Sequence, residues 1–329
     1  MKKIFTILAL TIVFSVNAQD FWFQGTLSNA IQTANATAIG NSSTAMGNGT
    51  IADGNSSTAM GYYTTAIGNY STAMGVGTGA RGGASTAMGS GTIASGDYST
   101  AMGVGTTASG NYSTAMGYGS EASGDYSTAM GRYTDAIGNY STAMGRHTTA
   151  SDYGSLVIGQ FNSSGSSVTN SDTEFSTANT AFVIGNGTGT GVDASDAFKV
   201  LFNGDTTIGN DLTVEGDVVV SSDARLKANI VSLGATLAKL LLIDGKSYTM
   251  KKDGKQKIGV LAQDIQKVFP ELVSTDDRDM LAVNYQGLVP VLINALKEQD
   301  AKMKEQDAKM KEQDAKMKEQ DAKMNVQQA

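Results

Sequence analysis

Cysteine is absent from this sequence of 329 residues, which excludes disulfides, thiolate zinc sites and cysteine catalysis. Histidine occurs once, at His147, where other copies of the repeat described below carry tyrosine, so we expect a surface position rather than a catalytic one. Two prolines stand against 39 glycines, a balance that favours a regular β array over a disordered linker. The net charge of −7 argues against nucleic acid as a partner.

Long apolar runs are also scarce. The chain begins MKKIFTILALTIVFSVNA, with a basic start, an apolar run and small residues at its end. This pattern predicts a signal peptide over residues 1–18, cleaved before Gln19. A membrane anchor is the alternative, although the run is short for a bilayer. No later segment is long and apolar enough to span a membrane, so we expect an exported protein, extracellular or on the cell surface.

A repeat occupies the first half of the chain. The motif STAMG occurs eight times at a 14-residue spacing from Ser43 to Ser141, and a second half-repeat such as TIASG lies between copies. Alanine therefore recurs every seven residues from Ala38 to Ala150. A fixed period with glycine at each turn predicts a solenoid of short strands.

Strand alternation predicts which side chains face inwards. In STAMG, serine and alanine point to one side, and threonine and methionine to the other. We expect alanine inside, where its small size lets two strand layers approach. The methionines from Met46 to Met144 would form a stripe roughly 40 Å long at about 4.8 Å per coil. Burial of this stripe in a cyclic trimer is our interpretation; the alternative is that methionine forms each chain's own core.

These coils resemble the head of YadA-like trimeric autotransporter adhesins over residues 34–160, ending in SLVIGQFN. The resemblance implies a left-handed parallel β-roll with two strands per 14-residue coil. The alternating strands of those adhesins' membrane anchor are not evident, so their route to the surface is not carried over. The calcium-binding repeat GGxGxDxUx is absent, and we expect no metal and no cofactor.

Residues 161–220 lose the 14-residue period and alternate apolar and polar residues between glycine turns. This alternation predicts a β-rich connector or shaft, similar to the shaft that precedes the processing domain of phage tail spikes. The residues that we expect in its short strands are Val200, Phe202, Ile208, Leu212, Val214 and Val218 to Val220.

From Ser222 the sequence reads as a small α+β domain. It resembles the endosialidase-type intramolecular chaperone of phage tail spikes over residues 221–298, through SSDARLKANI, IGVLAQDIQKVFPELV and LAVNYQGLVPVLINALKE. The resemblance implies self-cleavage, with Ser222 as nucleophile and Lys227 as its base. Asp223 and Arg225 also fit the family pattern.

The chemistry requires a neutral lysine, which burial or nearby positive charge can provide. Five residues of helix would place Ser222 and Lys227 about 140° apart, so they can pair only in a turn or between chains. Cleavage between Ser221 and Ser222, or before Asp223, both remain open. The alternative is that SSDARLK only caps and begins a helix.

The chain ends in four copies of KEQDAKM, and we predict a coiled coil over residues 296–326. Leu296 and the four repeat methionines share one heptad position, and glutamine occupies the other core position. The alternative is a solvated single helix with many ion pairs between residues i and i+4.

Together these patterns predict a mainly β protein: β-roll head, β shaft, small α+β chaperone domain and trimeric coiled coil. We interpret it as a secreted homotrimeric, adhesin-like fibre that is at most a single-turnover Ser–Lys auto-endopeptidase. The alternatives are a prophage tail fibre, or a structural fibre with an uncleaved trimerisation domain. The sequence does not identify the host-surface or matrix ligand that the head would bind.

Overall fold

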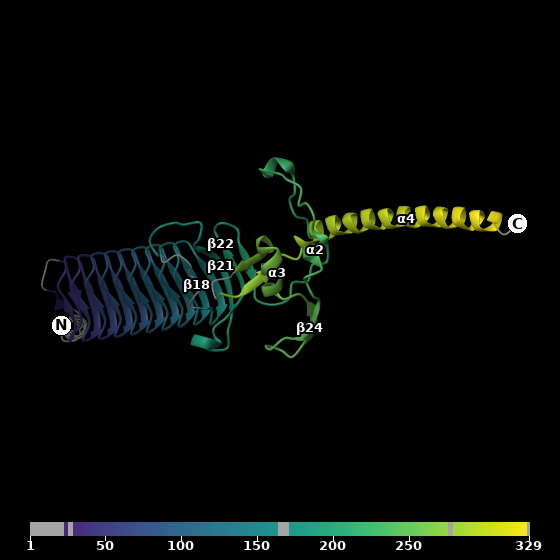
Figure 1. Cartoon of the computed structure of the whole chain (residues 1–329). Helices are drawn as coiled ribbons and strands as arrows, with labels where there is room; N and C mark the ends of the chain where they lie inside the picture. Colours follow the sequence, from purple (N-terminus) through teal and green to yellow (C-terminus); the bar gives the residue numbers. More distant parts are fainter. Residues whose placement is uncertain (1–22, 26–28, 164–170, 276–278, 328–329) are drawn as a thin grey trace, which may run out of the picture. The chain divides into compact units, whose positions relative to one another are not determined.

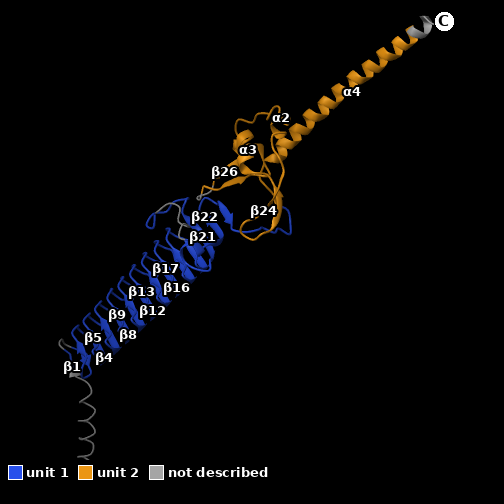
Figure 2. Ribbon diagram, turned by 60° about the horizontal axis from the view of Figure 1, so that its bottom comes forward, with its two compact units in different colours: residues 1–217 blue, residues 218–329 orange. Residues whose placement is uncertain are grey.

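The computed structural model describes residues 23–25, 29–163, 171–275 and 279–327. It divides into two compact units, residues 1–217 and 218–329, which Figure 2 draws in blue and orange. The predicted signal peptide lies outside the described residues. No helix within the described ranges is long and apolar enough to cross a membrane.

The first unit is a parallel β-solenoid whose coils stack as a ladder (Figure 1). Each STAMG copy forms a five-residue strand of one sheet, and each second half-repeat forms a two-residue strand of the other. The long strands are β4 Thr44–Asn48, β6 Thr58–Tyr62, β8 Thr72–Val76, β10 Thr86–Ser90, β12 Thr100–Val104, β14 Thr114–Tyr118, β16 Thr128–Arg132, β18 Thr142–Arg146 and β20 Leu156–Gln160. The short strands are β3 Thr37–Ala38, β5 Ile51–Ala52, β7 Thr65–Ala66, β9 Gly79–Ala80, β11 Ile93–Ala94, β13 Thr107–Ala108, β15 Glu121–Ala122, β17 Asp135–Ala136 and β19 Thr149–Ala150.

Alanine forms the core of this solenoid, as predicted. Every seventh residue from Ala38 to Ala150 is at most 1% exposed, and each pairs in register with the alanine 14 residues away. The methionines lie on the opposite side of the same strands and are only partly buried. The alternative in which methionine forms the chain's own core is therefore wrong.

The glycine of STAMG is required by the close approach of neighbouring coils. Gly103 has a φ of 121°, and a Cβ there would lie 2.0 Å from the carbonyl oxygen of Gly117. A side chain cannot occupy that space without moving the backbone. This explains why glycine ends the motif in all eight copies.

Side-chain amides cover both ends of the shorter sheet. At its first strand, Gln32 Oε1 accepts a hydrogen bond of 2.9 Å from the backbone N–H of Ala38. At its last strand, Asn162 accepts from Thr149 N at 2.8 Å and donates to Thr149 O at 3.0 Å. These amides take the place of a further strand, which blunts the exposed edges.

The longer sheet continues beyond the repeat at both ends. β1 Phe23–Gln24 pairs antiparallel with β2 Ile31–Gln32, and β21 Thr180–Asn186 adds parallel to β20. β22 Asp196–Leu201 and β23 Thr206–Ile208 follow antiparallel, after the short 3₁₀ helix η1 Gly191–Asp193. The first part of the predicted connector thus extends the sheet of the head.

The rest of the predicted connector differs from expectation. Val200 and Ile208 lie in strands, whereas Phe202, Leu212, Val214 and Val218 to Val220 do not. From Leu212 to Val220 these side chains are 45–89% exposed, because a single chain gives this extended segment no neighbouring strand. The prediction of strands there is wrong for the single chain.

The second unit is a small α/β arrangement followed by a long helix. Its elements are η2 Ala224–Leu226, α2 Leu237–Leu240, β24 Lys246–Thr249, β25 Gln256–Gly259, α3 Ala262–Val268, η3 Pro270–Leu272, β26 Val273–Thr275, β27 Leu281–Val283 and α4 Leu288–Gln327. β24 pairs with β25 and β26 with β27, both antiparallel. The core is small, with Ile265, Phe269 and Val291 at its centre.

Candidate functional site

A tight turn brings Ser222 and Lys227 together within one chain. The turn is the 3₁₀ helix η2, which follows Asp223, and the backbone N–H of Lys227 closes it by bonding the carbonyl oxygen of Ala224. Lys227 Nζ lies 2.7 Å from Ser222 Oγ, the distance of a hydrogen bond. Of the two arrangements that the sequence left open, the single chain adopts the turn.

Asp223 and Arg225 stabilise this turn. Asp223 Oδ1 accepts a bond of 2.8 Å from the backbone N–H of Arg225, and Arg225 Nη2 lies 2.7 Å from Asp223 Oδ2. The hydrogen bonds from Arg225 lower the pKa of the Asp223 carboxyl, and they raise the pKa of the guanidinium. The positive charge of Arg225 is therefore balanced inside its own chain rather than directed at Lys227.

Exposure limits what this pair can do in one chain. Ser222 and Lys227 are both exposed, and only η2 interrupts the irregular backbone between Ile208 and Leu237. Serine becomes a useful nucleophile when a neutral base accepts its proton, and a lysine becomes neutral through burial or nearby positive charge. In the single chain Ser222 and Lys227 are close enough to exchange a proton, but neither is buried.

The capping alternative also has a structural counterpart. Asp223 is the N-cap of η2, and its side chain accepts the bond that such a cap makes. The turn is only three residues long and no α-helix follows it directly. Capping by Asp223 and pairing of Ser222 with Lys227 therefore occur in the same turn, and neither excludes the other.

The long helix α4 contributes a residue that sequence reasoning missed. Glu298 Oε1 accepts a hydrogen bond from the backbone N–H of Thr236 and another, 3.2 Å long, from Leu237 N. The Thr236 hydroxyl donates to the carbonyl oxygen of Val291 at 3.1 Å. These contacts join the start of α2 to α4, and the bond from Thr236 N is the main cause of the lowered pKa of Glu298.

Nothing local distinguishes Glu298 in the sequence. It occupies the same position in KEQDAKM as Glu305, Glu312 and Glu319, each of which lies 2.6 Å from the lysine four residues later. Only the tertiary contact separates the first copy from the others. Those three ion pairs are the ones expected of a solvated helix.

Two family models match the chain. The YadA head domain repeat matches in overlapping pairs of copies over residues 52–134 and again over 136–162. The chaperone of endosialidase matches residues 222–274, a range that begins at Ser222 and contains Lys227. The two models fall in different compact units of the structure.

Curated relatives match a shorter part. The long tail fiber protein Gp37 of Escherichia phage AR1 is 35% identical over 92 residues, which is 25% of this chain and 8% of that protein. Its counterpart from Enterobacteria phage M1 is 32% identical over 97 residues, 26% of this chain and 39% of that protein. The chain thus spans less than half the length of either relative. What the matches establish is that this chain contains YadA head repeats between residues 52 and 162, followed by a chaperone of endosialidase domain over residues 222–274.

Proposed function

We propose that the protein is an exported homotrimeric fibre with an adhesin-like head, whose C-terminal domain holds three chains in register while they fold. The observation that carries this proposal is the apolar segment that contains η2 and extends on both sides of it. Its exposed side chains are Leu212, Val214, Val218, Val219, Val220, Leu226, Ile230, Val231 and Leu233, each 45–89% exposed. Stable soluble proteins rarely leave so many neighbouring apolar side chains exposed to water, so we expect this segment to be covered by another chain.

The helix α4 supports the same assembly because it has two apolar faces. Val291 and Ala295 are 3% exposed, and Val291 belongs to the small core of the domain. On another face, the heptad position shared by Val289, Leu296, Met303, Met310 and Met317 is 50–72% exposed. This stripe suits a parallel coiled coil of identical chains. Met324 would continue it, but its side chain lies outside those described.

The methionines of the STAMG repeats also favour an interface with other chains. The eight STAMG methionines stand in register on one sheet face and continue into Ile158 and Ile184. They are partly exposed in the single chain. In a trimer this face would be buried between heads.

Light scattering on the full chain tests the assembly. We expect three times the mass of one chain for Ser222→Ala, in which the self-cleavage proposed below cannot occur, and a smaller species when Val219→Asp and Leu226→Asp are added to it. Val192→Asp is the matched control, because Val192 is fully exposed on η1 outside this segment. A monomeric Ser222→Ala protein would overturn the trimer.

Self-cleavage is the second part of the proposal, and it rests on the 2.7 Å between Lys227 Nζ and Ser222 Oγ. Ser222 Oγ bonds to the carbonyl carbon of Ser221 while Lys227 accepts the hydroxyl proton. The bond to Ser222 N breaks, Lys227 returns the proton to that nitrogen, and an ester remains. Water then hydrolyses the ester, which leaves a carboxyl group on Ser221 and a free amine on Ser222.

Formation of the trimer would activate this cleavage. Three chains meeting at the exposed apolar segment would bury the pair and bring three lysines near one another, and both effects favour a neutral lysine. Cleavage would then occur only in correctly assembled trimers. The released head would be left kinetically stable, since its folding nucleus is gone.

Intact mass of the purified protein tests this step and identifies the bond. We expect a cut beside Ser222 in the wild type, and none in Ser222→Ala or Lys227→Ala. Ser221→Ala is the matched control and should still be cut. A wild type that is trimeric but uncut would make the domain a retained trimerisation clamp, and the peptidase role would be dropped.

A tail-fibre role is the second candidate, and the two phage tail fibre relatives favour it. The predicted signal peptide favours the cell surface instead. Immunogold labelling of producing cells and of purified virions separates the two. Label on virions would support the tail fibre, and label on the cell envelope alone would support the exported fibre.

A further inference from the structure

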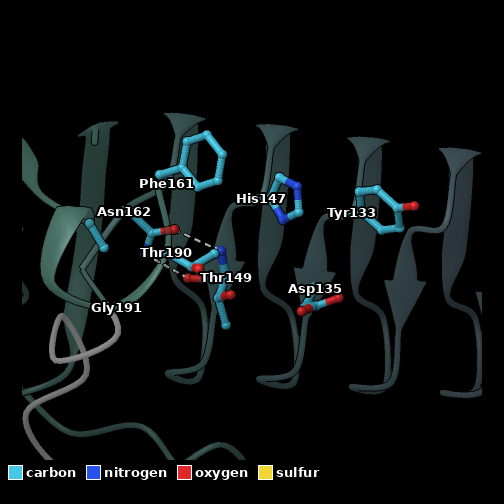
Figure 3. Close-up of a pocket in the computed structure, with 9 residues that line it drawn as sticks. Tyr133, Asp135, His147, Thr149, Phe161, Asn162, Thr190 and Gly191 are labelled. Atoms are coloured by element: carbon cyan, nitrogen blue, oxygen red, sulfur yellow. Dashed lines mark hydrogen bonds between the residues drawn. The ribbon is translucent and has the colours of Figure 1, made fainter. Parts of the chain in front are cut away.

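A small cavity lies where the shorter sheet of the solenoid ends. Its volume is about 180 Å³, and Figure 3 shows the side chains around it. Tyr133, His147 and Phe161 form a row along one side, and Asp135 and Thr149 lie on the facing strands β17 and β19. The turn that begins at Thr190 contributes the end of the cavity.

Acidic residues are unusual at the position of the repeat that Asp135 occupies. In the shorter sheet the outward position is occupied, coil by coil, by Thr37, Ile51, Thr65, Gly79, Ile93, Thr107, Glu121, Asp135 and Thr149. Two carboxylates therefore stand in register on adjacent strands, an arrangement that is destabilising by itself. A cation between them would remove that cost.

Asp135 is the carboxylate that the cavity contains. It is half-buried, and no hydrogen bond to its side-chain oxygens is found in the part of the chain that the structure describes. Burial is the main cause of its raised pKa, the neighbouring Glu121 adds to it, and His147 opposes it. A partly desolvated acceptor without a donor favours a ligand that brings its own N–H groups.

The aromatic row supplies an apolar wall. The ring centres of Tyr133 and His147 are 4.9 Å apart, and those of His147 and Phe161 are 4.8 Å apart. Arg132 and Arg146 contact the rings of Tyr133 and Phe161. Neither arginine is among the charges that shift the pKa of Asp135. An aliphatic chain could therefore pack on the rings while its charged end reaches Asp135.

We propose that this cavity binds a primary ammonium group carried on a short carbon chain, with Asp135 as its counter-ion and the Tyr133–His147–Phe161 row packing against the carbon chain. The size of the cavity fits such a group better than a drug-sized ligand. The site belongs to the head of one chain and is independent of Ser222 and Lys227.

Saturation-transfer NMR on the full chain tests the site, with n-butylammonium as probe and 1-butanol as its neutral counterpart. We expect saturable binding of the ammonium ion and binding of the alcohol weaker by about tenfold or more, since loss of one charge pair is worth at least that much in affinity. Equal binding of the two probes, or no binding of the ammonium ion, would overturn the proposal.

Two matched variants locate the site. Asp135→Thr removes the carboxylate but places there the residue found at Thr65, Thr107 and Thr149, so the coil should fold unchanged. We expect it to weaken ammonium binding about tenfold. Asp125→Asn is the control, because asparagine occupies the equivalent turn at Asn111 and Asn139. If Asp135→Thr binds as the wild type does, or Asp125→Asn loses binding equally, the assignment fails.

Discussion

Between β4 and β20 every strand of the longer sheet has a strand of the same chain on both sides, whereas residues 209–236 have no strand partner and expose their apolar side chains. The difference follows from the sequence. A repeat provides each coil with an identical neighbour 14 residues away, so its backbone groups are paired within the chain. Residues 209–236 lack a repeat, so no identical coil lies beside them in the chain, and under the proposed function they would gain a neighbour from other chains.

The largest expected effect comes from breaking the contact between neighbouring coils. Gly103→Ala would place a Cβ 2.0 Å from the Gly117 carbonyl oxygen, at a φ that alanine rarely adopts. We expect it to destabilise the head by about 3 kcal/mol or more. Thermal unfolding followed by circular dichroism measures this.

Gly105→Ala is the matched control for that change. Gly105 also has a positive φ, 62°, but nothing lies within 4 Å of an added Cβ. Tyr133 and His147 adopt the same conformation two and three coils later, so alanine should cost only about 1 kcal/mol there. Equal losses for the two variants would mean that backbone conformation, and not the close approach of coils, makes glycine necessary.

A second change should affect only the C-terminal unit. Glu298→Ala removes the acceptor for the N–H groups of Thr236 and Leu237, so we expect α2 to detach and the unit to unfold at lower temperature. Glu305→Ala removes the same residue from the next repeat and only an exposed ion pair, and should have little effect. Hydrogen exchange of residues 236–243 distinguishes the two.

The hydrogen bonds that Glu298 accepts also make the stability of the C-terminal unit depend on pH. Because the pKa of Glu298 is lower in the folded unit than its ordinary value of 4.5, its contribution to stability is present above that value. It is lost as the pH falls through the lower, folded pKa. We expect the C-terminal unit of the wild type to lose stability below about pH 4.5, and Glu298→Gln to lose less over that range. Identical acid profiles would contradict the role of Glu298.

The repeat allowed much of the head to be predicted from the sequence. Regular spacing revealed the strands, and the constancy of alanine in both half-repeats identified the core, because a small apolar residue recurs at the inward position of every repeat coil. The amides of Gln32 and Asn162 that cover the sheet ends were not predicted, since each occurs once and outside the period. Features that depend on the end of a repeat leave no periodic signal.

In the C-terminal unit prediction depended on resemblance, and it succeeded for local elements only. The helix predicted for the KEQDAKM copies lies within α4, Leu288–Gln327, whereas its pairing with other chains in a coiled coil stays a prediction. The catalytic assignment of Ser222 and Lys227 stays a prediction, although the turn places them in contact. Side chains that act through distant contacts, such as Glu298, cannot be recognised in a local motif.

The smallest expected effect concerns the tyrosine rings that stack between neighbouring coils on the surface of the head. Tyr112 stacks between Tyr98 and Tyr126, with ring centres 4.9 and 4.8 Å apart and planes within 4°. Tyr70 lies in the same column, but its neighbours there are Ser56 and Ala84. Tyr112→Ala should therefore cost about 1 kcal/mol from its two stacking contacts, and Tyr70→Ala less. Alanine already occupies this turn at Ala84, where φ is 52°, so neither change strains the backbone. Equal losses in thermal unfolding would show that the rings act singly and that stacking between coils adds nothing to the stability of the head.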